Sequence, residues 1–143
     1  MTLEIREARD NDAEAIVELI ADLGHSMTVE DVRDRIQTLP RPGYPQLVAT
    51  IDKRVVGLCG THIMMVIYRP RPVGRITILE VARDRRGRGI GRALVAEAEK
   101  RLRAAGCGMI EVTSNAKRLR AHAFYERLGY ERTSYRFAKQ LRE

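Results

Sequence analysis

A glycine- and arginine-rich segment is the part of this 143-residue sequence best suited to binding chemistry. It reads Val81-Ala82-Arg83-Asp84-Arg85-Arg86-Gly87-Arg88-Gly89-Ile90-Gly91-Arg92. The three alternate glycines carry no Cβ, so the backbone N–H groups around them can converge on one anion. A helix predicted to begin at Gly89 adds the partial positive charge of its N-terminus. With charge-assisted contacts from nearby arginines, the segment is predicted to bind a diphosphate.

The spacing of these glycines argues against two common nucleotide-binding loops. A dinucleotide-binding turn requires a third glycine at its sixth position, where this chain has Arg92 counted from Gly87, or Leu94 counted from Gly89. A mononucleotide-binding loop requires a lysine followed by serine or threonine, and neither is present here. A basic loop that only packs against a helix start is the alternative without a ligand.

The elements that must position this loop follow from the periodicity of apolar residues. Strands are predicted at Leu3–Arg6, Leu47–Ile51, Val55–Ile67, Arg75–Val81, Met109–Thr113 and Tyr130–Leu141. Helices are predicted at Asp10–Gly24, Thr28–Leu39, Gly89–Ala105 and Lys117–Leu128, with Asp10 and Thr28 as N-caps. This order predicts one α/β (α+β) domain over residues 1–143, with a mixed central sheet and helices on both faces.

Composition narrows the classes of partner. The chain has 26 Lys+Arg against 19 Asp+Glu, a net charge of +7, which suggests nucleic acid. The arginines are dispersed, aromatic residues are 5% and tryptophan is absent, so no base-stacking platform and no nucleic-acid partner are expected. No apolar run approaches the ~20 residues of a membrane span, and no export signal is predicted. The isolated thiols of Cys59 and Cys107 are typical of a cytoplasmic protein, and no spacing of side chains predicts a metal site.

Two motifs resemble the GNAT superfamily of N-acetyltransferases. Arg86-Gly87-Arg88-Gly89-Ile90-Gly91 resembles its motif of Gln or Arg, two residues, Gly, one residue, and Gly or Ala. The second signature is matched by Asn115, Ala121, Phe124-Tyr125, Glu126 and Gly129-Tyr130. The element order also matches along nearly the whole chain, and it implies a mostly antiparallel, splayed sheet. A weaker likeness in the C-terminal part points to the aminoalkylphosphonate N-acetyltransferase branch.

The resemblance implies acetyl-CoA as cofactor. The residues implied to bind its pyrophosphate, through backbone amides or side chains, are Arg86, Gly87, Arg88, Gly89, Ile90, Gly91 and Arg92. The pantetheine arm is expected to pair like an extra strand with Leu79 and Val81, where the sheet diverges. Asn115, just beyond the diverging strand, is expected to hold the same arm, and His122 to contact the cofactor.

The implied reaction is direct transfer of acetyl to an amine. Tyr125 occupies the family's tyrosine position and is the expected acid at the leaving sulfur, although it could merely pack beneath the cofactor. The Val81 N–H is the expected oxyanion donor. Glu80 is the candidate base because it is the only acid in its strand, but many family members carry their glutamate slightly earlier, at Thr77 or Ile78 here. Strict alternation places Glu80 on the face of Ile76 and Ile78, unless a bulge re-aims it.

Other roles stay open. His62 and Glu111 are alternative bases that would act through water. A small-molecule primary amine is the expected acceptor, and Arg69, Arg71 and Arg75 would favour one with an acid group. The alternatives are acetylation of a protein N-terminus or lysine, and a non-catalytic acyl-CoA-binding module. The segment after Gly129 is short for closing such a fold, so a homodimer in which a partner completes the exposed edge is possible.

Overall fold

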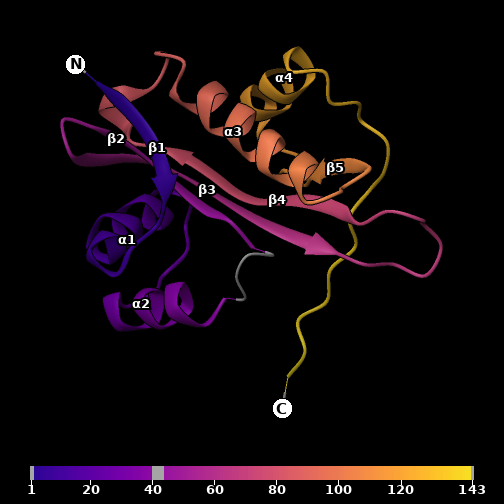
Figure 1. Ribbon diagram of the computed structural model, residues 1–143, viewed down its shortest axis with the longest axis horizontal. Helices are drawn as coiled ribbons and strands as arrows, with labels where there is room; N and C mark the ends of the chain where they lie inside the picture. The colour runs from indigo at the N-terminus through magenta and orange to yellow at the C-terminus, as the bar shows by residue number, and fades with distance from the viewer. Residues whose placement is uncertain (1, 40–43, 143) are drawn as a thin grey trace. The chain divides into compact units, whose positions relative to one another are not determined.

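The structure is a computed structural model that describes residues 2–39 and 44–142, in two compact units, Met1–Glu111 and Val112–Glu143. The first unit holds the sheet and its helices, and the second holds the last helix and the C-terminal segment (Figure 1). The elements in chain order are β1 (Leu3–Glu7), η1 (Asp10–Asp12), α1 (Ala13–Asp22), α2 (Val29–Thr38), β2 (Gln46–Ile51), β3 (Arg54–Met64), β4 (Val73–Val81), η2 (Arg83–Arg85), α3 (Ile90–Ala104), β5 (Met109–Val112) and α4 (Leu119–Arg127).

The sheet has five strands in the order β1-β2-β3-β4-β5. β1 to β4 pair antiparallel with their neighbours, as short connections allow. β5 follows β4 through α3, a crossover that makes the sheet mixed. The Gly108 N–H donates to the Pro72 carbonyl at 3.0 Å, and Arg75 pairs with Glu111 at 3.9 Å. The beginning of β5 therefore lies beside the beginning of β4.

Helices cover both faces of this sheet. α3 lies against β3 and β4 because these strands carry glycines beneath it: a Cβ on Gly57 would lie 2.9 Å from Leu94 Cδ1, and one on Gly74 would lie 2.9 Å from Leu102 Cδ1. α1 contacts β3 and β4 as well, and α1 and α2 lie on the side away from α3 (Figure 1). The predicted fold class, an open and mostly antiparallel mixed sheet with helices on both faces, is confirmed.

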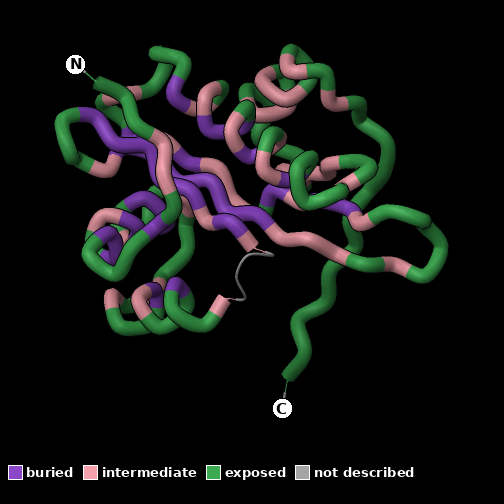
Figure 2. Tube along the Cα trace, viewed as in Figure 1, coloured by how far each residue is buried: buried purple, intermediate pink, exposed green. Residues whose placement is uncertain are grey.

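The core follows the periodicities that predict it. Leu94, Val95 and Leu102 of α3 are at most 1% exposed, and Leu47 and Val48 of β2 are fully buried (Figure 2). Burying a side chain of this size stabilises the fold by about 1.5–3 kcal/mol. The helix that follows the glycine-rich loop is thereby fixed on the sheet along its length.

The two predicted N-caps differ in outcome. The Thr28 hydroxyl accepts a hydrogen bond from the Asp31 N–H at 3.0 Å, as predicted. The prediction that Asp10 caps α1 is wrong, because Asp10 lies in η1 and its carboxylate accepts from Gln37 at 2.9 Å. Asp12 is the N-cap residue of α1 and is only 5% exposed.

The Asp12 carboxylate is held by a buried polar contact at the start of α1. It accepts two hydrogen bonds from the Arg6 guanidinium, at 2.7 and 2.9 Å, and one from the Arg9 N–H at 2.7 Å. Burial alone would raise the pKa of Asp12, but these hydrogen bonds and the Arg6 charge outweigh it and lower that pKa. The sequence pattern did not reveal this pair, since ion pairing depends on the register that brings β1 to the helix.

The prediction of a final strand at Tyr130–Leu141 is wrong, because none of residues 130–142 is in a helix or strand. An extended segment becomes a strand only where a neighbouring strand accepts its backbone hydrogen bonds. Across residues 2–39 and 44–142, no helix combines the length and apolar character required to cross a membrane.

Candidate active site

β4 carries a bulge that reorients its second half. Ile76 pairs with Thr61 and Ile78 pairs with Gly60, so Thr77 is an extra residue. Thr61 and Gly60 are consecutive and face opposite sides of the sheet, hence Ile76 and Ile78 also face opposite sides. Strict alternation therefore does not hold along this strand, and the bulge named as the alternative is present. Beyond Thr77, Ile78 and Glu80 share a face that Ile76 does not.

Glu80 is 5% exposed, and two donors converge on its Oε1 atom. The Val81 N–H lies 3.2 Å from it, and Arg86 Nη2 lies 3.1 Å from it. Arg86 Nε also donates to the Val81 carbonyl at 3.1 Å. Through these hydrogen bonds Arg86, the first residue of the predicted diphosphate motif, holds the motif against the end of β4. The buried carboxylate is satisfied by an opposite charge, as buried charges must be.

The Val81 N–H points toward the outer edge of β4. The adjacent Ala82 N–H donates to the Val56 carbonyl of β3 at 2.8 Å, and successive N–H groups alternate in direction along a strand. β5 has four residues against nine in β4 and lies beside the beginning of β4. Within the part of the chain that the structure describes, the edge at Leu79 and Val81 therefore has no strand beside it. Such an edge can bind an extended ligand by backbone hydrogen bonds.

The glycine-rich loop leads into α3 without a side-chain cap. Gly87 and Gly89 have φ values of +76° and +82°, a left-handed conformation that favours glycine. Gly89 is the N-cap residue, makes no side-chain hydrogen bond to the helix, and no acidic residue lies in the first turn. The first intrahelical donor is the Ala93 N–H, bonded to the Gly89 carbonyl at 3.0 Å. The N–H groups of Ile90, Gly91 and Arg92 therefore have no acceptor within the helix and are suited to an anion.

In the second unit, two buried polar atoms without a partner lie on either side of the turn that leads into α4, one on Ser114 and one on His122 of the first turn of α4. Asn115 Oδ1 accepts from the Lys117 N–H at 2.9 Å, and the Asn115 carbonyl lies 2.8 Å from His122 Nε2. A carbonyl only accepts, so Nε2 carries the proton and Nδ1 of a neutral ring is an acceptor. His122 Nδ1 and Ser114 Oγ are buried and have no hydrogen-bond partner among the described residues. Buried polar atoms of this kind are commonly completed by a ligand or by water.

Tyr125 lies on α4 of the same unit, in an aromatic cluster. Its ring packs edge-on against Phe124, with centroids 5.2 Å apart, and against Tyr130, with centroids 5.8 Å apart. The Tyr130 N–H also donates to the Tyr125 carbonyl at 3.0 Å, which closes the C-terminal end of the helix. The ring is therefore fixed by its neighbours, whatever the role of its hydroxyl.

Two of the three arginines expected near the acceptor amine, and the alternative base His62, make contacts within the protein. Arg75 pairs with Glu111 at 3.9 Å, and the Arg69 guanidinium lies 5.6 Å from the Tyr68 ring centroid. The His62 ring packs at 4.7 Å against Tyr44, tilted by 54°. An acceptor molecule that bound to one of these side chains would have to replace the contact described for it.

Two polar side chains, Gln46 of β2 and Thr77 of β4, meet over Gly60 of β3. They were not predicted as part of the site. A Cβ on Gly60 would lie 2.7 Å from both Gln46 Oε1 and Thr77 Oγ1, so only glycine leaves room for these two side chains. Thr77 is one of the two positions, with Ile78, at which a family glutamate was expected, and this was the one signal in the sequence for this location. For Gln46, the only signal in the sequence was a polar side chain at the start of an apolar strand.

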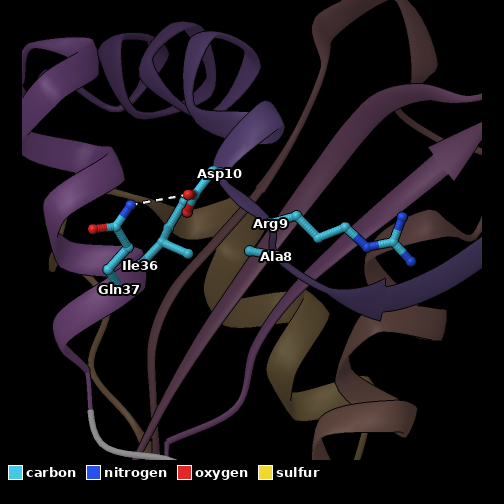
Figure 3. Close-up of a pocket in the computed structure, with 5 residues that line it drawn as sticks. All are labelled: Ala8, Arg9, Asp10, Ile36 and Gln37. Atoms are coloured by element: carbon cyan, nitrogen blue, oxygen red, sulfur yellow. Dashed lines mark hydrogen bonds between the residues drawn. The ribbon is translucent and has the colours of Figure 1, made fainter.

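Two hollows on the first unit lie apart from the predicted site residues. One is lined by Ala8, Arg9, Asp10, Ile36 and Gln37, with Asp10 and Gln37 joined by their hydrogen bond and the Arg9 side chain pointing away from them (Figure 3). A second is lined by Thr2, Glu4, Arg6, Arg9, Thr50, Asp52 and Lys53. Neither is lined by a predicted site residue. In residues 2–39 and 44–142, no three His, Cys, Asp or Glu side chains are grouped to hold a metal ion, and its absence stays a prediction.

Comparison with known proteins identifies the family. Among solved structures, a transcriptional regulator from Bacillus halodurans C-125 is 25% identical, with a TM-score of 0.89 over 98% of this chain and 100% of that chain. An acetyltransferase from Trypanosoma brucei is 26% identical, with a TM-score of 0.83 over 98% and 100% of the two chains. Glucosamine-6-phosphate N-acetyltransferase from Arabidopsis thaliana, 20% identical, shares the fold with a TM-score of 0.86 over 99% and 100%.

No curated protein matches the sequence. The sequence does match a family model, described as the acetyltransferase (GNAT) family, over residues 9–130. That match spans most of the chain and includes both motifs, the glycine-rich loop before α3 and the Phe124-Tyr125 pair on α4. The protein therefore belongs to the acetyltransferase (GNAT) family.

Proposed function

We propose that the chain is an acetyl-CoA-dependent N-acetyltransferase that transfers acetyl directly to a primary amine of a small molecule. The observation that carries this proposal is the uncapped N-terminus of α3 beside the open outer edge of β4. One arrangement thus offers donors for a diphosphate and an edge for an extended amide-bearing arm, the two parts of coenzyme A. Residues 1–143 would act as one N-acetyltransferase domain in the cytoplasm, without nucleic-acid or membrane partners.

The chain's own groups fit this cofactor. The amides of Ile90, Gly91 and Arg92 would hold the pyrophosphate, with Gly87 and Gly89 keeping the approach free of side chains. Arg88 and Arg92 would add charge-assisted contacts, while Arg86 would keep the loop tied to β4. Leu79 and Val81 would pair with the pantetheine arm. Asn115 and His122 are the further cofactor contacts that we propose. The unpartnered acceptor at His122 Nδ1 supports a ligand at the start of α4.

Acetyl-CoA supplies the acetyl group as a thioester. The Val81 N–H would stabilise negative charge on the acyl oxygen, a contribution of about 3 kcal/mol in comparable sites. It would first have to leave the Glu80 carboxylate, its partner in this structure. The Tyr125 hydroxyl would protonate the departing sulfur.

Glu80 would accept the proton from the attacking amine, directly or through water. Glu80 lies beyond the Thr77 bulge and faces away from α3, on the opposite face from Ile76. We take this orientation as support for its role as the base. His62 and Glu111 remain the alternatives through water. The His62 ring packs against Tyr44, and the Glu111 carboxylate pairs with Arg75. Either side chain would have to act from the position in which these contacts hold it.

A protein amine as acceptor, or a non-catalytic acyl-CoA-binding module, are the competing functions. Two measurements separate them. Acetyl-CoA, but not NAD, should raise the melting temperature, and thiol release should follow with one class in a panel of aminophosphonates, polyamines, aminoglycosides, amino acids and peptides. No thermal shift at saturating acetyl-CoA would contradict the cofactor. Release with peptides alone would favour a protein acceptor, and binding without any release would favour the module.

A further inference from the structure

Two side-chain oxygens approach one point above Gly60 of β3. A Cβ on Gly60 would lie 2.7 Å from Gln46 Oε1 and 2.7 Å from Thr77 Oγ1, so the two oxygens are at most twice that distance apart. One nitrogen atom can therefore lie about 2.9 Å from both, the usual length of an N–H···O hydrogen bond. All three residues belong to the first unit, on β2, β3 and β4. The absence of a side chain at Gly60 keeps this point open.

The Gln46 amide is held so that its oxygen, and not its nitrogen, faces this point. Nε2 donates to the Thr61 carbonyl at 2.8 Å and to the Tyr44 carbonyl at 3.3 Å. Carbonyl oxygens only accept hydrogen bonds, so the amide nitrogen must lie on their side and Oε1 on the other. The Thr77 hydroxyl can accept as well as donate, and Thr77 is exposed although it lies in the middle of a strand. Two acceptors are thus available to the donors of one ligand atom.

The same face of the sheet carries Glu80, the proposed base. Gly60 pairs with Ile78, and Leu58 pairs with Glu80. Gly60 and Leu58 are two residues apart on β3, so they share a face, and their Cα atoms are separated by about 7 Å. Glu80 therefore occupies the next position along the face on which the two oxygens meet.

The proposed course of the cofactor leads to this place. The pyrophosphate would lie at the N-terminus of α3, and the pantetheine arm would pass Val81 and then Leu79. Continuing in that direction along β4 leads to Thr77. The thioester end of the arm is thereby directed toward the two oxygens, which is where an acceptor amine has to approach.

We propose that Gln46 Oε1 and Thr77 Oγ1 accept hydrogen bonds from the two N–H groups of the acceptor amine and so select a primary amine. The inference rests on the proposed acetyl transfer and names two residues that position its nucleophile. A neutral primary amine has two N–H groups and one lone pair, so two acceptors engage both N–H groups and leave the lone pair for the acyl carbon.

The transfer itself is balanced by one proton at each end. The nitrogen lone pair forms the N–C bond, and the electron pair of the C–S bond goes to sulfur. The nitrogen gives up one proton, which Glu80 accepts in the proposed reaction, and the sulfur gains one. A secondary amine has a single N–H group, so it loses one of the two hydrogen bonds and has to place a carbon substituent beside an oxygen.

Competition between a primary amine and its mono-N-methyl derivative tests this pair of oxygens. The probe is the amine of the panel described above that gives the fastest thiol release. Wild type should favour the primary amine in kcat/KM. Thr77→Val keeps the shape of the side chain without its hydroxyl and should reduce that preference by about 2- to 10-fold, the effect of one neutral hydrogen bond. Thr77→Ser, which restores a hydroxyl, should restore the preference.

A second variant fills the point between the oxygens. Gly60→Ala would place a methyl group 2.7 Å from each of them, and the fold can accommodate it by moving the ends of two flexible side chains. It should lower kcat/KM for the primary amine. The Kd for coenzyme A, measured by calorimetry, should be unchanged in all three variants, and circular dichroism establishes that they are folded.

The other outcomes separate this inference from the enzymatic proposal. An unchanged preference in Thr77→Val, or a preference lost equally in Thr77→Ser, would overturn the role of the hydroxyl while acetyl transfer remains. A wild type that acetylates both amines equally would remove the selection. Weaker binding of coenzyme A to Gly60→Ala would assign this point to the cofactor instead of the acceptor. No thiol release with any amine of the panel would contradict the acetyltransferase itself, and the inference with it.

Discussion

Replacing Gly89 by alanine separates the stability of the α3 N-terminus from its capacity to bind an anion. Gly89 has a φ of +82°, and a Cβ there would meet no atom within 4 Å. The free protein therefore experiences backbone strain without a steric clash. Gly106 at the other end of α3 is a matched control, since its φ is +92° and its Cβ would also lie in open space.

The two effects have different sizes. A left-handed conformation costs an L-residue about 1–2 kcal/mol, so both alanine variants should lose that much stability. For a chain of this length the melting temperature should fall by about 2–8 °C in each. If the backbone at residue 89 relaxes from its left-handed conformation, the N–H groups of the first α3 turn no longer point toward one anion. Losing one charge-assisted hydrogen bond of about 1.5–3 kcal/mol weakens binding by roughly 10- to 100-fold.

Thermal unfolding and calorimetric titration with coenzyme A measure both quantities. Gly89→Ala should raise the Kd for coenzyme A by that factor, and Gly106→Ala should leave it unchanged despite an equal loss of stability. Wild-type affinity in Gly89→Ala would refute the assignment of the diphosphate to this loop. An equal loss of affinity in Gly106→Ala would show that binding follows stability rather than local geometry.

Three further substitutions test other residues. Tyr125→Phe should lower kcat by about 10- to 10³-fold with little change in KM for acetyl-CoA, and full activity would remove this hydroxyl from the mechanism. Because the pKa of Asp12 is lowered in the fold, its contribution to stability is present above the ordinary value of 3.8 and is lost as the pH falls through the folded pKa. In urea unfolding between pH 7 and pH 3, Asp12→Asn should therefore be less stable than wild type at pH 7 and less dependent on pH, and an equally steep dependence would contradict the Asp12–Arg6 contact. Burial raises the pKa of Cys59 to about 12, so in a Cys107→Ser variant a thiol reagent at pH 8 should modify Cys59 only on unfolding. Rapid modification of the folded variant would show that this thiol is accessible.

Sequence patterns predicted the elements whose causes are local. The helix after the glycine-rich loop was expected at Gly89–Ala105 and is observed at Ile90–Ala104, because its apolar face and its glycine boundaries lie within the segment itself. The Thr28 cap was predicted for the same reason. The strand expected at Val55–Ile67 is observed at Arg54–Met64.

Features that depend on partners distant in sequence were not predictable in the same way. The Asp12 carboxylate at the N-cap of α1 is paired with the Arg6 guanidinium, which β1 brings to it from outside the helix. The expected strand at Tyr130–Leu141 had a suitable pattern, but a strand forms only with a neighbour, and no pattern within the segment supplies one.

The sequence by itself determined the family and the loop, since two motifs and their spacing are properties of the chain. It also determined that glycines precede a long helix, which is enough to predict an anion site at the helix start. Only the tertiary structure decided what surrounds that loop. The register of β3 against β4 makes Thr77 an extra residue and turns Glu80 to the face away from α3, where Oε1 meets the Val81 N–H and Arg86. Register is a relation between two strands, so neither strand alone carries that information.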